Sequence, residues 1–469
     1  MTGRRQNEIM TRRPKAPKPI SCRLYRLATL AAAGWLLGSA FATQAAPKEA
    51  PGPAPLDGWL TKPAVWTDGA QSFMDECGPI GFEYESGRDV ARSVYPGLSF
   101  LGGRVWEAQA FFAAGRVTRV ELLLFSRGDT GDLPEEGFDR LVKNMTDSLT
   151  RWAGSKGIGL PESLERGSRH VQGRAWYKPP CRTEMEWAST AASHAAGAAT
   201  PFRAEYVRIR LMPSGNDGGA LAAPAGAHPV TPSTISLKSR VRHSDNGDAW
   251  ISDIPMVDQG EKGYCAAATA ERVLRYFGKP VDQHQVAQIA DTARDKGTSL
   301  EGMLVALKTI GQPYQLDLRP LQEFDWAEVV NLLRAYNRAA AGKRKPEIEF
   351  GQSIDLGRVY SAMDPGVLRQ ARGRDTQGIA RFRQQVAQYT TAGVPLVWGV
   401  MVGLYPEAPP LRVRGAFGHV RLIVGQNTKT DEILYSDTWG PGHECKRMPT
   451  SDAWAMTVSL HVLKPRDVR

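Results

Sequence analysis

Apolar residues follow two different periods in the first half of the chain. Segments Gly81–Glu85, Gln109–Ser126 and Phe202–Leu211 are rich in alternating, β-branched or aromatic residues, a pattern that predicts half-buried antiparallel strands. Between them, Phe138–Trp152 repeats apolar residues at helical spacing. We therefore expect a small α+β domain over residues 57–213. This stretch contains no chemical motif, so the sequence does not indicate its role.

The second half of the chain begins with helical patterns and ends with strand patterns. Cys265–Phe277 consists of good helix formers with apolar residues at core spacing. Much later, Phe417–Gly425 and Ile433–Gly440 have the apolar runs of two paired strands. We expect a second α+β domain over residues 248–469. Residues 214–247 are rich in Gly, Ala, Pro, Ser and Thr, which predicts a linker between the two domains.

The N-terminus has the composition of an export signal. A basic stretch ends at Arg26, a largely apolar run follows over Leu27–Ala42, and small residues lead to Pro47. The run is too short to span a bilayer comfortably, and the small residues beyond it favour cleavage. We expect residues 1–46 to be a signal peptide and the mature protein to be exported, either periplasmic or secreted, with no stable membrane insertion. An uncleaved membrane anchor is the alternative.

Composition excludes some classes of protein. Of the 469 residues, 42% are hydrophobic and 23% are charged, as in ordinary globular proteins. The formal net charge is +10, but much of the basic excess lies in the signal segment. Because no basic stripe interleaved with aromatic residues is present, we expect no nucleic-acid partner.

The five cysteines do not have metal-site spacing. The chain shows neither a Cys-x-x-Cys nor a His-x-x-x-His pattern, so we expect no metal and no cofactor. Cys77 and Cys181 both fall in the predicted first domain. They could pair in an oxidising compartment, and the sequence leaves that pairing open.

Cys265 is the candidate nucleophile. Gly263 interrupts the preceding segment, so Cys265 is expected at the N-terminus of its helix, where unpaired N–H groups and the helix dipole favour the thiolate. Gln259 lies six residues earlier on a glycine-bearing loop. Its amide could form an oxyanion hole with the backbone N–H of Cys265. Taken alone, Cys265 could equally be a small buried residue.

A histidine and an aspartate near the end of the chain complete the constellation. His419 begins the apolar strand 417–425, and Asp437 ends its expected partner strand. A catalytic thiol needs an imidazole as proton partner, and the imidazole needs a third group to hold its tautomer. We expect His419 and Asp437 to fill these roles on adjacent strands. Each residue alone would more simply be a core histidine and a turn aspartate.

Together these residues resemble the papain-like cysteine peptidases. The resemblance covers residues 251–463 and is nearest to the bacterial double-glycine-peptidase-like branch, which processes bacteriocin leaders. It implies a papain-like domain with a helical half and an antiparallel sheet half. It also implies Gln259 as oxyanion donor, Cys265 as nucleophile, His419 as base and Asp437 as orienting acid. Trp439 matches the indole that covers the His–acid pair, and Trp439 and Tyr264 are the candidate substrate-binding residues.

Other residues near these motifs have simpler expected roles. Tyr264, beside the nucleophile, is expected to be a cleft wall or a packing residue. His284 has polar sequence neighbours, which favours a solvated side chain. His443 and Cys445 are expected on a loop near the cleft. Extra helical material between Leu316 and Val394 could line or cap the site.

Three functions remain in competition at this point. The first is a cysteine peptidase that cleaves peptide or isopeptide bonds of a peptide or protein substrate through a Cys265 thioester. The second keeps the same triad for acyl transfer or amidase action on cell-wall peptides. The third is a catalytically silent papain-like module that only binds. The presence of Gln259, Cys265, His419 and Asp437 together favours an enzyme.

Overall fold

The structure is a computed structural model of the whole chain. It describes residues 52–85, 88–161, 163–165, 169–191, 201–214, 237–260, 263–279, 281, 283–290, 292, 300–351, 354–411 and 415–466. All of these residues belong to one compact unit, Trp35–Arg469. The predicted signal peptide lies outside the described residues.

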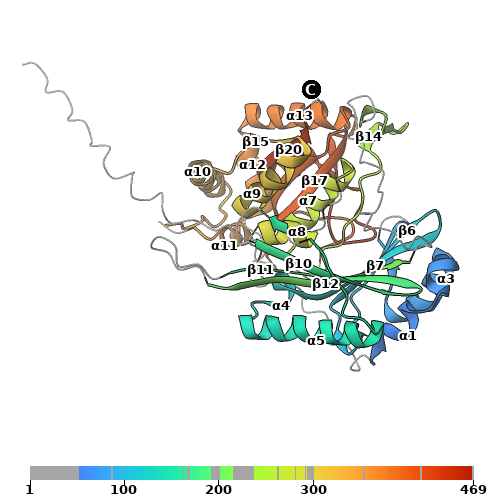
Figure 1. The fold of residues 1–469 in the computed structure, drawn as a ribbon. Coiled ribbons are helices and arrows are strands. Elements are labelled where there is room, and N and C mark those ends of the chain that lie inside the picture. The colour runs from blue at the N-terminus through green and yellow to red at the C-terminus, as the bar shows by residue number, and fades with distance from the viewer. Residues whose placement is uncertain are drawn as a thin grey trace, which may run out of the picture. The chain divides into compact units, whose positions relative to one another are not determined.

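The N-terminal part of the described chain is built on an antiparallel sheet. Nineteen-residue helix α5 (Glu135–Ala153) packs on β10 and β12 and covers one face of this sheet (Figure 1). Its apolar stripe buries Phe138, Met145 and Leu149, as helical spacing requires. Among the described residues the sheet has nine strands. Their order is β2 (Glu83–Tyr84), β3 (Val90–Ser93), β6 (Glu107–Ala113), β7 (Arg116–Ser126), β12 (Arg203–Pro213), β11 (Cys181–Thr190), β10 (Arg169–Lys178) and β8 (Ile158–Gly159), with β9 (Ser163–Glu165) also paired to β10.

Shorter elements complete this part of the fold. Phe73 of α3 meets Phe82 and Phe112 edge to face, which closes the core at that end. The elements are β1 (Ala54–Pro55), α1 (Asp57–Leu60), α2 (Ala64–Thr67), α3 (Ala70–Cys77), η1 (Gly78–Ile80), β4 (Leu98–Phe100), β5 (Gly103–Arg104) and α4 (Arg127–Thr130).

The C-terminal part begins with helices and continues into a second antiparallel sheet. Helix α7 (Cys265–Tyr276) packs against β17 (Phe417–Asn427), which is buried along almost its whole length. The other helices of this group are α8 (Gln283–Ile289) and α9 (Leu300–Gly311), followed by η2 (Gln312–Tyr314). The sheet order is β13 (Val241–His243), β14 (Asp248–Ile251), β17, β16 (Leu396–Val402), β20 (Thr457–Pro465) and β15 (Leu316–Gln322), with β18 (Glu432–Ser436) paired to β17 and to β19 (Lys446–Pro449).

Four further helices stand between β15 and β16. Helix α13 (Thr376–Thr391) lies against β14 and β17, while α10 (Trp326–Gly342) packs on α12 (Pro365–Gly373). All four begin at an aspartate whose carboxylate accepts a backbone N–H, the N-cap arrangement that stabilises a helix start. The remaining helices are α11 (Leu356–Ala362) and, between β19 and β20, α14 (Thr450–Met456).

These observations confirm the α+β class, with a helical half followed by an antiparallel sheet half in the C-terminal part. Two large hydrophobic cores are present, one formed by residues between 54 and 211 and the other by residues between 237 and 463. The second core includes Leu237, which is fully buried, and β13 pairs with β14. The end of the predicted linker is therefore part of the folded structure.

The two cysteines of the N-terminal core are free thiols. The sulfur of Cys181 donates to the main-chain oxygen of Leu60 at 3.3 Å, and burial raises the pKa of Cys181 to about 11. Burial also raises the pKa of Cys77. The structure thus contains no Cys77–Cys181 disulfide, the pairing that the sequence left open.

In the part of the chain that the structure describes, every helix falls short of the length or the apolarity that a membrane span requires.

Candidate active site

Cys265 is the first residue of α7, as its sequence context predicts. The helix begins when the backbone N–H of Ala268 donates to the oxygen of Tyr264 at 2.8 Å. The Cys265 side chain is 4% exposed, and its sulfur interacts with the main-chain N–H of Val420, the residue after His419. The nucleophile predicted from one end of the domain therefore lies beside the histidine strand from the other end.

Burial of the sulfur favours the thiol, against the expectation of a thiolate. Burial raises the pKa of Cys265 to about 11. The backbone N–H groups of Val420, Ala266 and Cys265 oppose this shift without cancelling it. The helix N-terminus does favour the ionised form, but desolvation of the buried sulfur is the larger effect.

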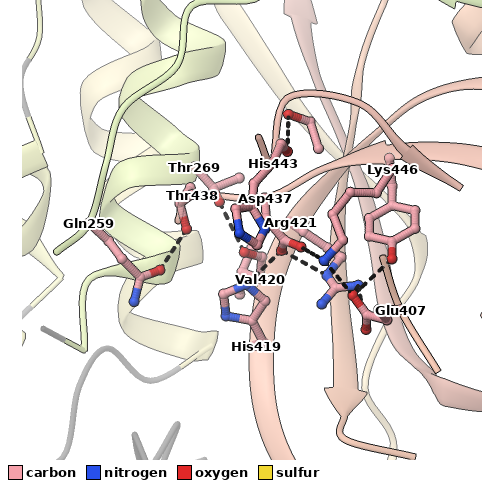
Figure 2. Close-up of polar contacts among 12 residues, drawn as sticks. Gln259, Thr269, Glu407, His419, Val420, Arg421, Asp437, Thr438, His443 and Lys446 are labelled. Atoms are coloured by element: carbon pink, nitrogen blue, oxygen red, sulfur yellow. Dashed lines mark hydrogen bonds and ion pairs between the residues drawn. The ribbon is translucent and has the colours of Figure 1, made fainter. Parts of the chain in front are cut away.

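His419 and Asp437 form a buried hydrogen-bonded pair. Strands β17 and β18 lie side by side, so His419 on β17 and Asp437 just after β18 come together across the hairpin. Nε2 of His419 is 2.9 Å from Oδ1 of Asp437 (Figure 2). The side chains are 2% and 0% exposed. This geometry can fix the tautomer of the imidazole, as the sequence predicts.

A cage of charged residues around Asp437 was not predicted from the sequence. Nε of Arg421 is 3.0 Å from Oδ1 of Asp437, and Nζ of Lys446 is 3.0 Å from Oδ2. Both cations also contact Glu407, at 3.2 Å and 2.7 Å (Figure 2). Tyr435 donates its hydroxyl to the same glutamate at 2.8 Å. Because Arg421 is two positions after His419, the two share one face of the strand, and this was the available sequence signal.

The charged residues of the cage keep Asp437, the partner of His419, ionised. Burial by itself raises the pKa of Asp437, but the charge of Arg421, the hydrogen bond and charge of His419 and the charge of Lys446 outweigh it and hold that pKa well below its ordinary value. Burial lowers the pKa of His419, and its contacts with Asp437 only partly oppose this shift. A neutral imidazole beside an ionised carboxylate is the resulting state near neutral pH.

Trp439 covers the imidazole, as the family resemblance implies. Its ring is stacked on that of His419 with centroids 4.3 Å apart and an interplanar angle of 14°. The indole therefore keeps water from one face of the His419–Asp437 pair, which strengthens their interaction.

Gln259 is anchored to the residue after Asp437. Its backbone N–H donates to the oxygen of Thr438 at 2.8 Å, and Thr438 Oγ1 donates to its side-chain Oε1 at 2.6 Å (Figure 2). With the amide oxygen held in this way, Nε2 lies on the opposite side of the side chain. This orientation is compatible with the predicted role as a donor to an oxyanion.

Arg272 joins the nucleophile helix to the acid loop. From α7 its guanidinium donates to the oxygen of Pro255 at 2.8 Å and to the oxygen of Asp437 at 2.6 Å. A third hydrogen bond of 2.5 Å reaches Oγ of Ser436. The side chain is 1% exposed, so this buried cation fixes α7 relative to the end of β18.

Tyr264 is the packing residue that was one of its two predicted roles, not a cleft wall, and the prediction that His284 is solvated is wrong. Tyr264 is 1% exposed and has no surface to offer a substrate, because its hydroxyl lies 2.9 Å from Oγ of Ser126 in a buried contact. His284 is not solvated, since its side chain is 12% exposed and its ring meets that of Tyr264 at 5.6 Å. Its Nε2 is 3.7 Å from Oε1 of Glu107. Partners from the N-terminal sheet bury both rings, and sequence neighbours could not reveal them.

The loop after Asp437 is placed as predicted, next to the site. The main-chain oxygen of His443 accepts the backbone N–H of Asp437 at 3.0 Å, and Cys445 is an exposed free thiol. No group of three or more His, Cys, Asp or Glu side chains suited to a metal occurs among the described residues.

A pocket lies among the helices between β15 and β16, and β15 and α14 also contribute to its lining. It measures about 300 Å³, and Glu328, Arg372, Asp375 and Trp454 are among its lining residues. None of the predicted site residues lines it. This cavity does not test the prediction that the extra material lines or caps the catalytic site, and α11 does pack against β17, the strand of His419.

The helical half, the antiparallel sheet and a buried thiol that interacts with the residue after His419 are features of a cysteine peptidase-like domain. Residues 251–461 match the model of the Peptidase_C39-like family. Among solved structures, the chain is similar to xylellain, a cysteine protease from Xylella fastidiosa, with 11% identity, coverage of 49% of this chain and 88% of that chain, and a TM-score of 0.25. That likeness is too distant to carry an argument about the site. No curated protein matches the chain significantly. The family match supports a papain-like peptidase without distinguishing the double-glycine branch.

Proposed function

We propose that the protein is an exported cysteine peptidase that hydrolyses peptide or isopeptide bonds through a thioester on Cys265. The observation that carries the proposal is the 2.9 Å contact of His419 Nε2 with Asp437, on a strand whose next residue, Val420, interacts with the Cys265 sulfur. With Nε2 held by the carboxylate, Nδ1 is the ring nitrogen left to exchange a proton with the thiol.

The reaction takes place in two stages. His419 removes the proton of Cys265 as the sulfur attacks the carbonyl carbon of the scissile amide. Gln259 and the backbone N–H of Cys265 stabilise the oxyanion, a contribution of roughly 3 kcal/mol for each such donor. The C–N bond then breaks, and the amine leaves with the proton from His419. Water, deprotonated by His419, next hydrolyses the thioester, which releases the carboxylic acid and restores the thiol.

The charges around the site suit this neutral starting pair. Because Cys265 is a thiol and His419 is uncharged at rest, the imidazole acts as a general base during attack rather than as a preformed imidazolium. Asp437, kept ionised by Arg421 and Lys446, stabilises the imidazolium that forms transiently.

A thiol-directed epoxide tests this assignment. At micromolar concentration it should label Cys265, detected by peptide mass spectrometry, and Cys265→Ala should abolish the labelling. Cys445→Ala is the matched control, because Cys445 is the exposed free thiol of the same domain. We expect it to leave the labelling unchanged. Labelling of Cys265→Ala equal to that of the wild type would contradict the peptidase proposal and favour a binding module.

Export rests on the N-terminal sequence and has its own test. The apolar run Leu27–Ala42 and the small residues before Pro47 are those of a cleaved signal. Protein recovered from outside the cytoplasmic membrane should therefore begin near Pro47 by N-terminal sequencing. An intact Met1 on membrane-associated protein would instead identify an uncleaved anchor.

A further inference from the structure

The N-terminal sheet contacts the residue directly before the proposed nucleophile. The hydroxyl of Tyr264 lies 2.9 Å from Oγ of Ser126, the last residue of β7. The ring also lies over Gly128 in α4, so closely that a Cβ on Gly128 would overlap the hydroxyl and two ring carbons. Because close-packed interiors resist such overlap, Gly128 determines where Tyr264 can lie, and Tyr264 is covalently joined to Cys265.

The same sheet contacts the residue directly before the proposed oxyanion donor. Asp258 precedes Gln259, and its Oδ2 is 3.3 Å from NH1 of Arg92 on β3. Arg92 also lies 3.0 Å from Oε2 of Glu107 on β6, and these two side chains are 6% and 3% exposed. The other carboxylate oxygen of Asp258 accepts the backbone N–H of Gly260 at 2.7 Å. A buried cation of the N-terminal sheet thus holds the carboxylate that shapes the Gln259 turn.

Helix α8 connects these two contacts. His284 meets the ring of Tyr264 edge to face at 5.6 Å, and its Nε2 is 3.7 Å from the other oxygen of Glu107. The side-chain amide of Gln283 donates to the oxygen of Asp258 at 3.2 Å. The two anchoring points are therefore parts of one packed network.

We propose that the N-terminal sheet is a permanent part of the catalytic site and positions the segment that carries Gln259 and Cys265. Gly128 and Ser126 position the residue before the nucleophile, and Arg92 positions the residue before the oxyanion donor. This inference rests on the proposed function. It assigns the N-terminal region a role that the sequence left open, and it excludes activation by removal of that region, because removal would strip Tyr264 of its cover and Asp258 of its arginine.

The overlap between Gly128 and Tyr264 allows a double-mutant test in the full chain. The probe is iodoacetamide, and the readout is the rate of Cys265 alkylation at pH 7 in excess of the rate in His419→Ala. Gly128→Ala should lower this His419-dependent rate by at least about tenfold, because a displacement of about 1 Å can cost two orders of magnitude. Adding Tyr264→Leu removes the overlap. The double variant should then react within about threefold of Tyr264→Leu alone.

The test includes a matched control and two variants that change the structure less than Gly128→Ala does. Gly159 lies in the same sheet with no atom near its Cβ position, so Gly159→Ala should keep the wild-type rate. Ser126→Ala and Tyr264→Phe remove only the buried hydroxyl contact. Each should lower the His419-dependent rate about fivefold, the size of one hydrogen bond, and the two together should be no slower than either alone.

The outcomes separate the two proposals. A wild-type rate and pH profile in Gly128→Ala would overturn the positioning role, and so would losses that simply multiply in the double variants. Should Gly128→Ala fail to fold, the hydroxyl pair decides the question. If the wild-type protein itself shows no His419-dependent alkylation of Cys265, the proposed function fails instead.

Discussion

Replacement of His419 by alanine is expected to slow the alkylation of Cys265 by iodoacetamide at pH 7 by roughly 10³-fold. General bases contribute about 10² to 10⁴ to such reactions. The effect is large here because burial raises the pKa of Cys265 to about 11, so that about one sulfur in 10⁴ is ionised at pH 7 without help. The rate is measured by mass spectrometry of the Cys265 peptide over time.

The pH dependence of the Cys265 alkylation rate is a further test of the role of His419. In the wild type the rate should fall as pH drops through the pKa of His419, which burial places below its ordinary value of 6.5, because the base is then protonated. In His419→Ala the rate should instead rise about tenfold per pH unit toward the pKa of the thiol. His243 is an exposed histidine on β13, and His243→Gln should retain the wild-type profile. Identical profiles in the wild type and His419→Ala would contradict the general-base role.

Replacement of Asp437 by asparagine is expected to lower the free energy of unfolding by about 3–5 kcal/mol at pH 7, the usual cost of removing one partner from a buried ion pair. Arg421 and Lys446 are 0% and 1% exposed, and the variant leaves Glu407 as their anionic partner. Since the pKa of Asp437 is lowered by folding, its contribution is present above the unfolded value near 3.9 and is lost as pH falls below it. Urea denaturation at pH 7 and at lower pH measures both effects.

A surface carboxylate provides the matched control for this variant. Asp431 pairs with Arg383 at 2.6 Å, but the side chains are 54% and 44% exposed. Asp431→Asn should therefore cost about 1 kcal/mol or less. In Asp437→Asn, the further change Lys446→Met removes the surplus charge and should recover part of the loss. Equal small losses in the two asparagine variants would contradict the prediction, because they would show that the charge of Asp437 contributes little to the free energy of unfolding.

Local patterns sufficed to predict the elements that carry the site. Helix α7 and the β17–β18 hairpin were predicted because a run of helix formers and two apolar strands have strong local signatures. The long hairpin of β10 and β11 was not predicted, although it contributes two interior strands of the N-terminal sheet. Its residues from 169 to 190 include many charged and polar side chains, which weaken the strand signal.

The charged cage and the burial of His284 could not be predicted in this way. Glu407 stands outside any strand, and Lys446 opens β19. Pairing of β19 with β18 brings Lys446 to Asp437, and Glu407 joins the cage through its contacts with Arg421 and Lys446. No local period encodes such contacts. His284 has polar sequence neighbours, yet a carboxylate more than 170 positions earlier, Glu107, accounts for its environment. Both the charged cage and the burial of His284 therefore depend on tertiary contacts that local sequence patterns do not reveal.

Arg272 has a consequence for how the domain loses its activity. From the helix that starts at Cys265, its guanidinium donates two hydrogen bonds to the turn that presents Asp437, at the oxygen of Asp437 and Oγ of Ser436, and a third to the oxygen of Pro255. The nucleophile helix and the acid can move apart only when the two bonds to Ser436 and Asp437 break. Hinge-like opening between them is thereby disfavoured, and we expect thermal inactivation to coincide with cooperative unfolding of the domain.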